Sequence, residues 1–108
     1  MKTLLFTLLY GCTILSAQLF INEIDYNQPS TDQSEFLEIA GLAGSYQDVT
    51  IVLINGNNNS EYNTFDLGTI TLADESQGYG FYVIGGSAIP NVDYTSGFPS
   101  SNAIQNGD

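Results

Sequence analysis

The sequence contains no histidine and no tryptophan, and it has only one cysteine and one basic side chain in 108 residues. The basic residue is Lys2 and the thiol is Cys12, so both lie near the N-terminus. The remainder lacks the side chains of Ser-His-Asp and Cys-His nucleophilic sites, of His- or Cys-ligated zinc sites, and of lysine Schiff bases. It also has no disulfide and no thiol chemistry. Carboxylates are the only strong catalytic groups left.

The shortage of basic side chains makes the chain strongly acidic. Twelve Asp and Glu against one Lys or Arg give a formal charge of −11, and loss of the +1 of Lys2 would change it to −12. Nucleic acid binding depends on Lys and Arg that neutralise phosphates, so the composition excludes direct nucleic acid binding by this segment. A surface of this sign also repels anionic lipid headgroups and attracts cations.

Signals for helices are missing after the N-terminal segment, because no long window has apolar residues at i, i+3, i+4 and i+7. Short runs rich in Thr, Val, Ile, Tyr and Phe, separated by Asn and Gly, indicate an all-β protein. Turn signals about every ten residues favour a sandwich or a small barrel. The hydrophobic share of 43% is that of a globular protein, and the length suits one domain.

Residues 1–17 have the three parts of a secretory signal peptide: Lys2, an apolar stretch over residues 4–15, and small residues ending at Ala17. The apolar stretch is shorter than the roughly 20 residues that span a bilayer. We expect cleavage after Ala17, which leaves a domain at residues 18–108 without a transmembrane span. The expected location is the medium or the cell surface. Lipoprotein processing at Cys12 is the alternative, since residues 9–12 (LYGC) partly resemble a lipobox.

The pattern predicts short strands at residues 19–24, 36–39, 49–54, 61–67, 69–72 and 79–84. Residues 41–47 (GLAGSYQ) and 55–60 (NGNNNS) are predicted as turns, and Gly68 is predicted to interrupt a strand. The run at 49–54 is apolar on both faces, which is typical of a central strand. Residues 87–108 are expected to form a loop. We expect the core to contain Phe20, Phe36, Phe65 and Phe81.

Several of these runs carry a family resemblance. Residues 20–24 (FINEI) followed by residues 35–39 (EFLEI) resemble the opening of the lamin-tail domain, where an I-N-E strand precedes an E-F-x-E-L/I strand. Residues 49–68 resemble the strand and Asn- and Gly-rich hairpin of its secreted bacterial members. Residues 79–85 (YGFYVIG) resemble its later G-F/Y-x-V-I/V-G strand. The similarity covers most of residues 19–108.

The resemblance implies an immunoglobulin-like antiparallel β-sandwich. In exported bacterial proteins such domains accompany a separate catalytic domain, commonly an extracellular nuclease, or a cell-surface sorting domain. The expected partners are therefore a downstream domain of the same protein and an extracellular or cell-surface protein or carbohydrate. Members of the family continue past residues 105–108 into a further apolar strand, so we expect a fragment with an exposed sheet edge. A complete small domain is the alternative.

The carboxylates have three interpretations. A glycosidase pair of Glu23 with Glu35 or Glu38 can be drawn, but no Trp, Arg or His accompanies it, so no catalytic residue is assigned. The calcium candidates are Glu23, Asp25, Asp32 and Glu35, with a second acidic loop at residues 74–75, and calcium should then raise the melting temperature. Solvated surface acids are the alternative. In the resembling family Asn22, Glu23, Glu35, Phe36 and Glu38 occupy structural positions, where carboxylates accept backbone or cross-strand hydrogen bonds.

Two functions remain open on the sequence. The first is a non-catalytic exported module that binds, spaces or anchors within a larger secreted protein. The second is an N-terminal accessory domain of an extracellular hydrolase, such as a nuclease, whose catalytic domain lies beyond Asp108. The absence of catalytic side chains outside the carboxylates motivates the first, and the resemblance motivates the second.

Overall fold

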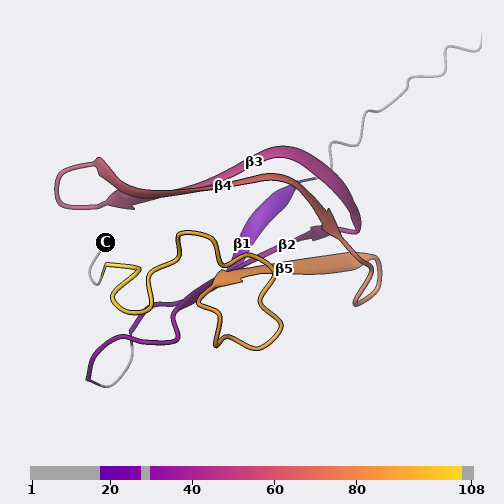
Figure 1. Ribbon diagram of the computed structural model, residues 1–108. Coiled ribbons are helices and arrows are strands. Elements are labelled where there is room, and N and C mark those ends of the chain that lie inside the picture. The colour runs from indigo at the N-terminus through magenta and orange to yellow at the C-terminus, as the bar shows by residue number, and fades with distance from the viewer. Residues whose placement is uncertain (1–17, 28–29, 106–108) are drawn as a thin grey trace, which may run out of the picture.

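The structure is a computed structural model that describes residues 18–27 and 30–105 (Figure 1). Its strands are β1 (Leu19–Asp25), β2 (Phe36–Leu42), β3 (Gly44–Asn55), β4 (Ser60–Leu72) and β5 (Tyr79–Gly85). They form a three-stranded sheet in the order β1-β2-β5 and a two-stranded sheet of β3 and β4, with antiparallel pairing throughout. The expected all-β fold is therefore confirmed. The expected signal peptide at residues 1–17 lies outside the described residues.

The β3-β4 hairpin packs over one face of the three-stranded sheet (Figure 1). Alternation along β2 places Leu37 and Ile39 in the core, each 2% exposed, and turns Phe36 and Glu38 to the opposite face. The core joins both layers, and its buried members are Leu37, Ile39, Phe65, Leu67, Ile70, Leu72, Ile84, Ala103 and Ile104. Within the described ranges no helix is long and apolar enough to cross a membrane.

The sequence predicts that Gly68 interrupts a strand. In the structure Gly68 instead forms a bulge inside the continuous β4. Its φ is 62°, a left-handed conformation that glycine adopts without steric cost, and the pairing register with β3 shifts beside it. Buried residues fall at Phe65 and Leu67 before the bulge, and at Ile70 and Leu72 after it. The extra residue changes the phase of alternation, so both halves of β4 direct apolar side chains into the core.

The predicted turn at residues 41–47 is wrong, because β2 continues to Leu42 and β3 already begins at Gly44. Gly41 marks a close approach instead: a Cβ there would lie 2.9 Å from the Leu19 Cδ2 atom and 3.2 Å from the Tyr46 hydroxyl. That hydroxyl donates a hydrogen bond of 2.7 Å to the Leu42 carbonyl, which joins the start of β3 to the end of β2. Glycine therefore serves packing between the layers here.

The prediction that residues 49–54 form a central strand is also wrong. β3 pairs only with β4, and its apolar residues divide between the two faces. Val49, Ile51 and Leu53 are half-buried against the core, whereas Val52 and Ile54 on the other face are 40% and 52% exposed. An apolar run alone does not show whether a second layer covers its outer face.

The predicted aromatic core is partly correct. Phe65 is 2% exposed and stacks on Phe98, with ring centroids 5.4 Å apart. Phe36 and Phe81 are half-buried on the outer face of the three-stranded sheet. The placement of Phe20 in the core is wrong, because this side chain is 47% exposed. It lies on the edge strand β1, opposite Ala40, on a face that the hairpin does not cover.

Residues 86–105 are irregular, as expected, yet they complete the core. Ala103 and Ile104 are buried in it, and Gln33 pairs with Ser101 through an isolated antiparallel bridge. Figure 1 shows this segment, coloured from orange to yellow, running from β5 toward the tip of the hairpin. At the tip the side chain of Asn55 donates a 2.6 Å hydrogen bond to Gln105. The segment thus acts as a strap across both layers.

Candidate functional site

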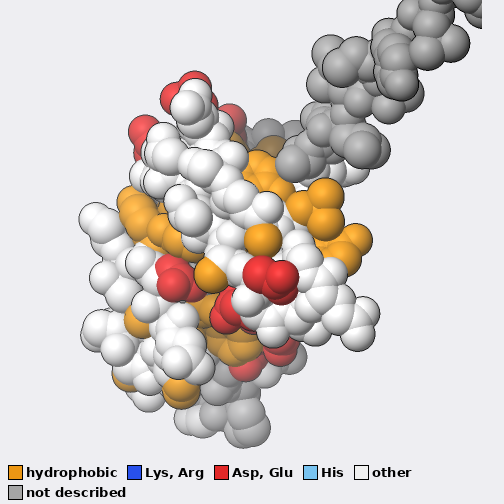
Figure 2. Space-filling view, turned by 90° about the vertical axis from the view of Figure 1, so that its right-hand side faces the viewer, with side chains coloured by type: hydrophobic (Ala, Val, Ile, Leu, Met, Phe, Trp, Pro, Cys, Tyr) orange, Lys and Arg blue, Asp and Glu red, His pale blue; other side chains and the backbone are white. Residues whose placement is uncertain are grey.

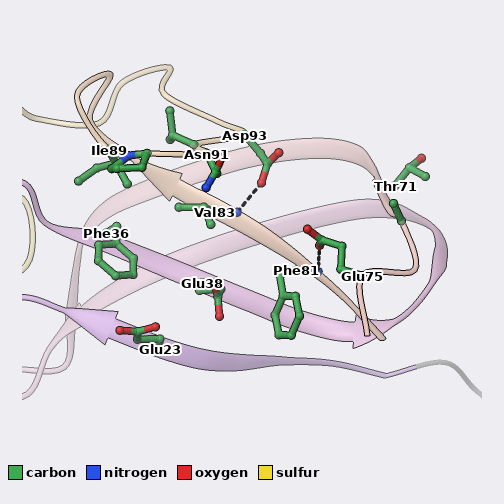
Figure 3. A pocket seen from close by; sticks show the side chains of 13 residues that line it. Glu23, Phe36, Glu38, Thr71, Glu75, Phe81, Val83, Ile89, Asn91 and Asp93 are labelled. Atoms are coloured by element: carbon green, nitrogen blue, oxygen red, sulfur yellow. Dashed lines mark hydrogen bonds between the residues drawn. The ribbon is translucent and has the colours of Figure 1, made fainter. Parts of the chain in front are cut away.

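A groove of about 620 Å³ lies on the outer face of the three-stranded sheet, and we call it the acidic groove. Four carboxylates and several apolar side chains line it (Figure 3). Its lining is Glu23, Phe36, Glu38, Thr71, Ala73, Glu75, Phe81, Val83, Ile89, Pro90, Asn91, Val92 and Asp93. The groove therefore combines an aromatic and aliphatic floor with negative charge.

Strand register positions the floor of the acidic groove. Glu38 lies opposite Glu23 of β1 on one side and opposite Val83 of β5 on the other, so all three project from the same face. Phe36 and Phe81 lie on either side of Glu38 in Figure 3. The alternation that buries Leu37 and Ile39 in the core therefore also builds this groove.

Three of the four carboxylates in the groove hold hydrogen bonds within the protein. Glu75 accepts from the backbone N–H of Phe81 at 2.9 Å, and Asp93 accepts from that of Val83 at 2.8 Å (Figure 3). Glu38 accepts from the side-chain amide of Asn22 at 2.8 Å. Such charge-assisted bonds fix the orientation of a carboxylate. The role that the structure shows for these three carboxylates is to accept hydrogen bonds from the protein itself.

Tyr82 of β5 lies opposite Ile39 on the core face of the sheet, and the pKa of its phenol is raised. Burial raises the pKa of its phenol above the ordinary value of 10.0, and the neighbouring charges of Asp93 and then Tyr94 raise it further. A raised pKa keeps the phenol neutral at physiological pH. Tyr82 is therefore a packed core neighbour and not an activated base.

The four calcium candidates divide between the strap, to which Asp32 and Glu35 are bonded, and strand β1, which carries Glu23 and Asp25. Glu35 is 2% exposed, and its two carboxylate oxygens accept the backbone N–H groups of Ala103 at 2.6 Å and Ile104 at 3.1 Å. Asp32 is 7% exposed, and its carbonyl accepts the N–H of Asn102 at 2.9 Å. Glu23 and Asp25 lie on β1.

No group of three or more acidic, His or Cys side chains that could hold a metal ion occurs in residues 18–27 and 30–105. The calcium prediction therefore has no geometric support among the described residues. Glu35 instead makes the kind of backbone hydrogen bonds that the structural interpretation expects. The pairing of Glu23 with Glu35 as glycosidase acids also has no support, because Glu35 is buried beside the strap and does not line the acidic groove.

Sequence reasoning found some lining residues of the acidic groove and missed others. Glu23, Phe36 and Glu38 belong to the quoted strand motifs, and Glu75 to the acidic loop at residues 74–75. Asp93 was missed, because it follows the last strand in a stretch of Asn, Pro and Ser without periodicity. Only the return of residues 92–94 along β5 brings it to the groove.

A second cavity of about 370 Å³ separates β1 from β3, and we call it the apolar groove. Its lining is Leu19, Phe20, Ile21, Ile39, Asp48, Val49, Thr50 and Ile51. Residues of β1 form one wall, residues of β3 form the other, and Ile39 of β2 contributes from the core. The two layers of the protein are therefore not closed along this side.

Comparison with known proteins finds no matching family model, no matching curated protein and no matching solved structure.

Proposed function

We propose that the chain is a non-catalytic, exported β-sandwich module of the immunoglobulin-like, lamin-tail type, which acts by binding within a larger secreted protein. Two packed antiparallel layers support the sandwich architecture, and the order of the motifs at residues 20–24, 35–39 and 79–85 supports the family. The leader-like composition of residues 1–17 supports export.

The observation that carries the non-catalytic assignment is the state of the carboxylates. In the acidic groove, Glu38, Glu75 and Asp93 each accept a hydrogen bond from the protein itself. No His, Lys, Arg or Cys occurs after Cys12 to tune an acid or to activate a nucleophile. A groove of this composition suits recognition of a ligand, and it holds no His, Lys, Arg or Cys beside its carboxylates.

The ligand class follows from the lining of the groove. Phe36 and Phe81 offer apolar and aromatic surface, and Glu23 with Glu38 offers negative charge. An extracellular protein with Lys or Arg at its surface matches both features, because guanidinium and ammonium groups bind carboxylates and aromatic faces. A carbohydrate is a poorer match, since the chain has no Trp.

An accessory domain of an extracellular hydrolase is the second candidate. The resemblance at residues 20–24 and 35–39 favours it, since such domains accompany nucleases in exported bacterial proteins. The chain offers no catalytic group of its own for that reaction. Any turnover would therefore belong to another domain, and this module would position it.

Assays of the purified chain test the non-catalytic assignment. We expect no nuclease activity on single- or double-stranded DNA with magnesium or calcium, and no glycosidase activity on chromogenic β-glycosides. A matched variant, Glu38→Gln, removes the central carboxylate of the acidic groove while keeping its shape. Turnover by the chain that this variant abolishes would refute the proposal, because it would show that Glu38 acts in catalysis.

A further inference from the structure

The free edge of β1 is the feature that leads beyond the proposed function. β1 is the first strand of the sheet order β1-β2-β5 and pairs only with β2. An edge strand presents alternate backbone N–H and C=O groups to its unpaired side. Within the described part of the chain, no backbone hydrogen bond reaches this side of β1 at residues 19–24. The edge therefore offers the template that an additional strand requires.

Apolar side chains accompany this edge. Ile21 and Ile24 are on the face of β1 that continues the core, since they lie opposite Ile39 and Leu37 of β2, yet they are 46% and 49% exposed. The hairpin covers β2 and β5 but leaves this part of β1 open. Exposed apolar residues in a row along an unpaired edge mark a surface for association.

The apolar groove lies on the same side of the molecule. Residues 19–21 of β1 form one wall and residues 48–51 of β3 form the other. β3 pairs only with β4, so its second edge is also without a strand partner in the described structure. One extended segment in this groove would pair with the backbone of an edge strand and place alternate side chains against Ile21, Val49 and Ile51.

Charge selects the occupant of the apolar groove. Asp48 lines it, and Glu23 and Asp25 follow on β1 beyond the groove. The chain carries −11 in total and has no Lys or Arg after Lys2. Figure 2 shows one face of the molecule, on which hydrophobic side chains lie beside Asp and Glu. A segment that alternates apolar with basic residues satisfies both the apolar walls and the acidic surroundings.

We propose that the β1 edge and the apolar groove form an acceptor site for an extended basic segment of a partner protein, which adds as a strand beside β1. This inference rests on the proposed binding function and names the class of partner. The register shift between Ile21 and Glu23 limits regular pairing to the part of β1 at residues 19–21, next to the groove. The acidic side chains beyond it select Lys or Arg.

A second copy of the chain fits this site less well. Parallel, in-register pairing of two β1 edges would place Glu23 and Asp25 beside the same residues of the other copy, and like charges across paired strands are destabilising. Association would also bring together two chains that each have a formal net charge of −11. The same charge that repels a copy attracts a basic segment, with an association rate that falls as ionic strength rises.

Peptide binding to the full chain tests the site. The probe is a fluorescent seven-residue peptide of alternating Val and Lys, as long as the seven residues of β1. The control peptide alternates Val and Glu. We expect the Lys peptide to bind, with an affinity that falls about tenfold from roughly 0.05 to roughly 0.5 M salt, and the Glu peptide not to bind.

Two variants with the same change of charge locate the binding. Ile21→Lys places a cation on the β1 edge, and Val52→Lys places one on the far face of the hairpin, where the side chain is 40% exposed. We expect Ile21→Lys to lower the affinity for the Lys peptide about tenfold or more, and Val52→Lys to change this affinity about twofold or less. Unchanged melting temperatures would show that both variants are folded. Amide exchange should become slower in residues 19–21 on binding.

Several outcomes would overturn the site. These are equal binding of the two peptides, equal loss in the two variants, and protection that maps to the acidic groove instead of β1. Absence of peptide binding would also overturn the proposed site, whether the apolar groove stays empty or another part of the chain fills it. A dimer that Ile21→Lys dissociates would assign the edge to a second copy. None of these results would restore enzymatic turnover, so the non-catalytic assignment is judged separately.

Discussion

The two edges of the three-stranded sheet are built in opposite ways. At the β5 edge, the N–H groups of alternate residues each have an acceptor: Phe81 bonds the carboxylate of Glu75, Val83 that of Asp93, and Gly85 the carbonyl of Tyr94. At residues 19–24 of the β1 edge, the described residues supply no such acceptor, and apolar side chains are exposed. One edge is closed by side chains and a returning loop, and the other is open.

The difference shows how an acidic chain protects a sheet edge. Proteins commonly place Lys on edge strands, but this chain has no Lys after Lys2. It instead uses carboxylates as hydrogen-bond acceptors for backbone N–H groups that would otherwise bind another strand. Glu35 does the same for the strap at Ala103 and Ile104. Because the chain has this means of closing an edge, the open state of β1 is consistent with a binding role.

The largest expected effect comes from releasing the strap that covers the β5 side. Glu35→Gln replaces one accepting oxygen by an amide that donates, so a buried N–H of Ala103 or Ile104 loses its partner. We expect a loss of about 3 kcal/mol in the free energy of unfolding, measured by chemical denaturation. The control is Glu61→Gln at an exposed position, for which we expect a loss of about 0.5 kcal/mol or less in the free energy of unfolding. Equal losses in both variants would contradict a special role of Glu35.

The second effect tests the close contact between β5 and the end of β4. A Cβ at Gly80 would collide with the carbonyl oxygen of Ala73 and lie 2.7 Å from the Cβ of Leu72. We expect Gly80→Ala to destabilise the protein by about 2 kcal/mol, because the added methyl group meets backbone and Cβ atoms of Leu72, which ends β4, and of Ala73, which follows it. Gly86→Ala adds a methyl group that meets nothing within 4 Å and should be near neutral. Thermal unfolding of the pair measures the difference.

The third prediction exchanges the character of the two edges. Asp93→Ala removes the acceptor of the Val83 N–H. This loss should lower the free energy of unfolding by about 1 kcal/mol, and it should open the β5 edge to another strand. We expect faster aggregation than in the parent chain, followed by light scattering near the melting temperature. Ile21→Lys should slow aggregation, because it places a charge on the edge that is already open. An aggregation rate that changes with neither substitution would show that neither edge controls association.

The smallest effect concerns alkaline pH. The pKa of Tyr82 is raised by burial and by Asp93, so the folded state retains a proton that the unfolded state loses above its ordinary value of 10.0. The folded state is therefore favoured up to about that pH, and stability falls as pH rises toward the raised pKa. Tyr82→Phe should flatten this part of the stability profile, whereas the exposed Tyr26→Phe should not. Identical profiles would contradict the assignment.

Much of the strand pattern was predictable because it depends on local chemistry. β1, β4 and β5 follow alternating or β-branched runs, and Asn- and Gly-rich residues mark the tip of the hairpin. The turn predicted at residues 41–47 is wrong in extent, because β2 continues to Leu42 and β3 begins at Gly44, and Gly41 serves a close approach to Leu19 and Tyr46. Gly68 was misread for a related reason: a bulge and a break have the same residue signature.

The candidate site was predictable only in part. Glu23, Phe36 and Glu38 share a face through strand alternation, which the sequence displays. Glu75 and Asp93 reach the same groove through hydrogen bonds to β5 that no local pattern announces. The burial of Glu35 was equally hidden, because its partners lie 68 and 69 residues away along the chain.

The sequence alone determined the all-β class, the acidic character and the lack of His, Lys, Arg and Cys after Cys12. These properties depend on composition and on neighbours in the chain, and they need no knowledge of distant contacts. Tertiary structure decided which edge is closed and which is open. That choice depends on the strap of residues 86–105 returning along β5 and leaving β1 uncovered, and such a return is a long-range event that local propensity does not encode.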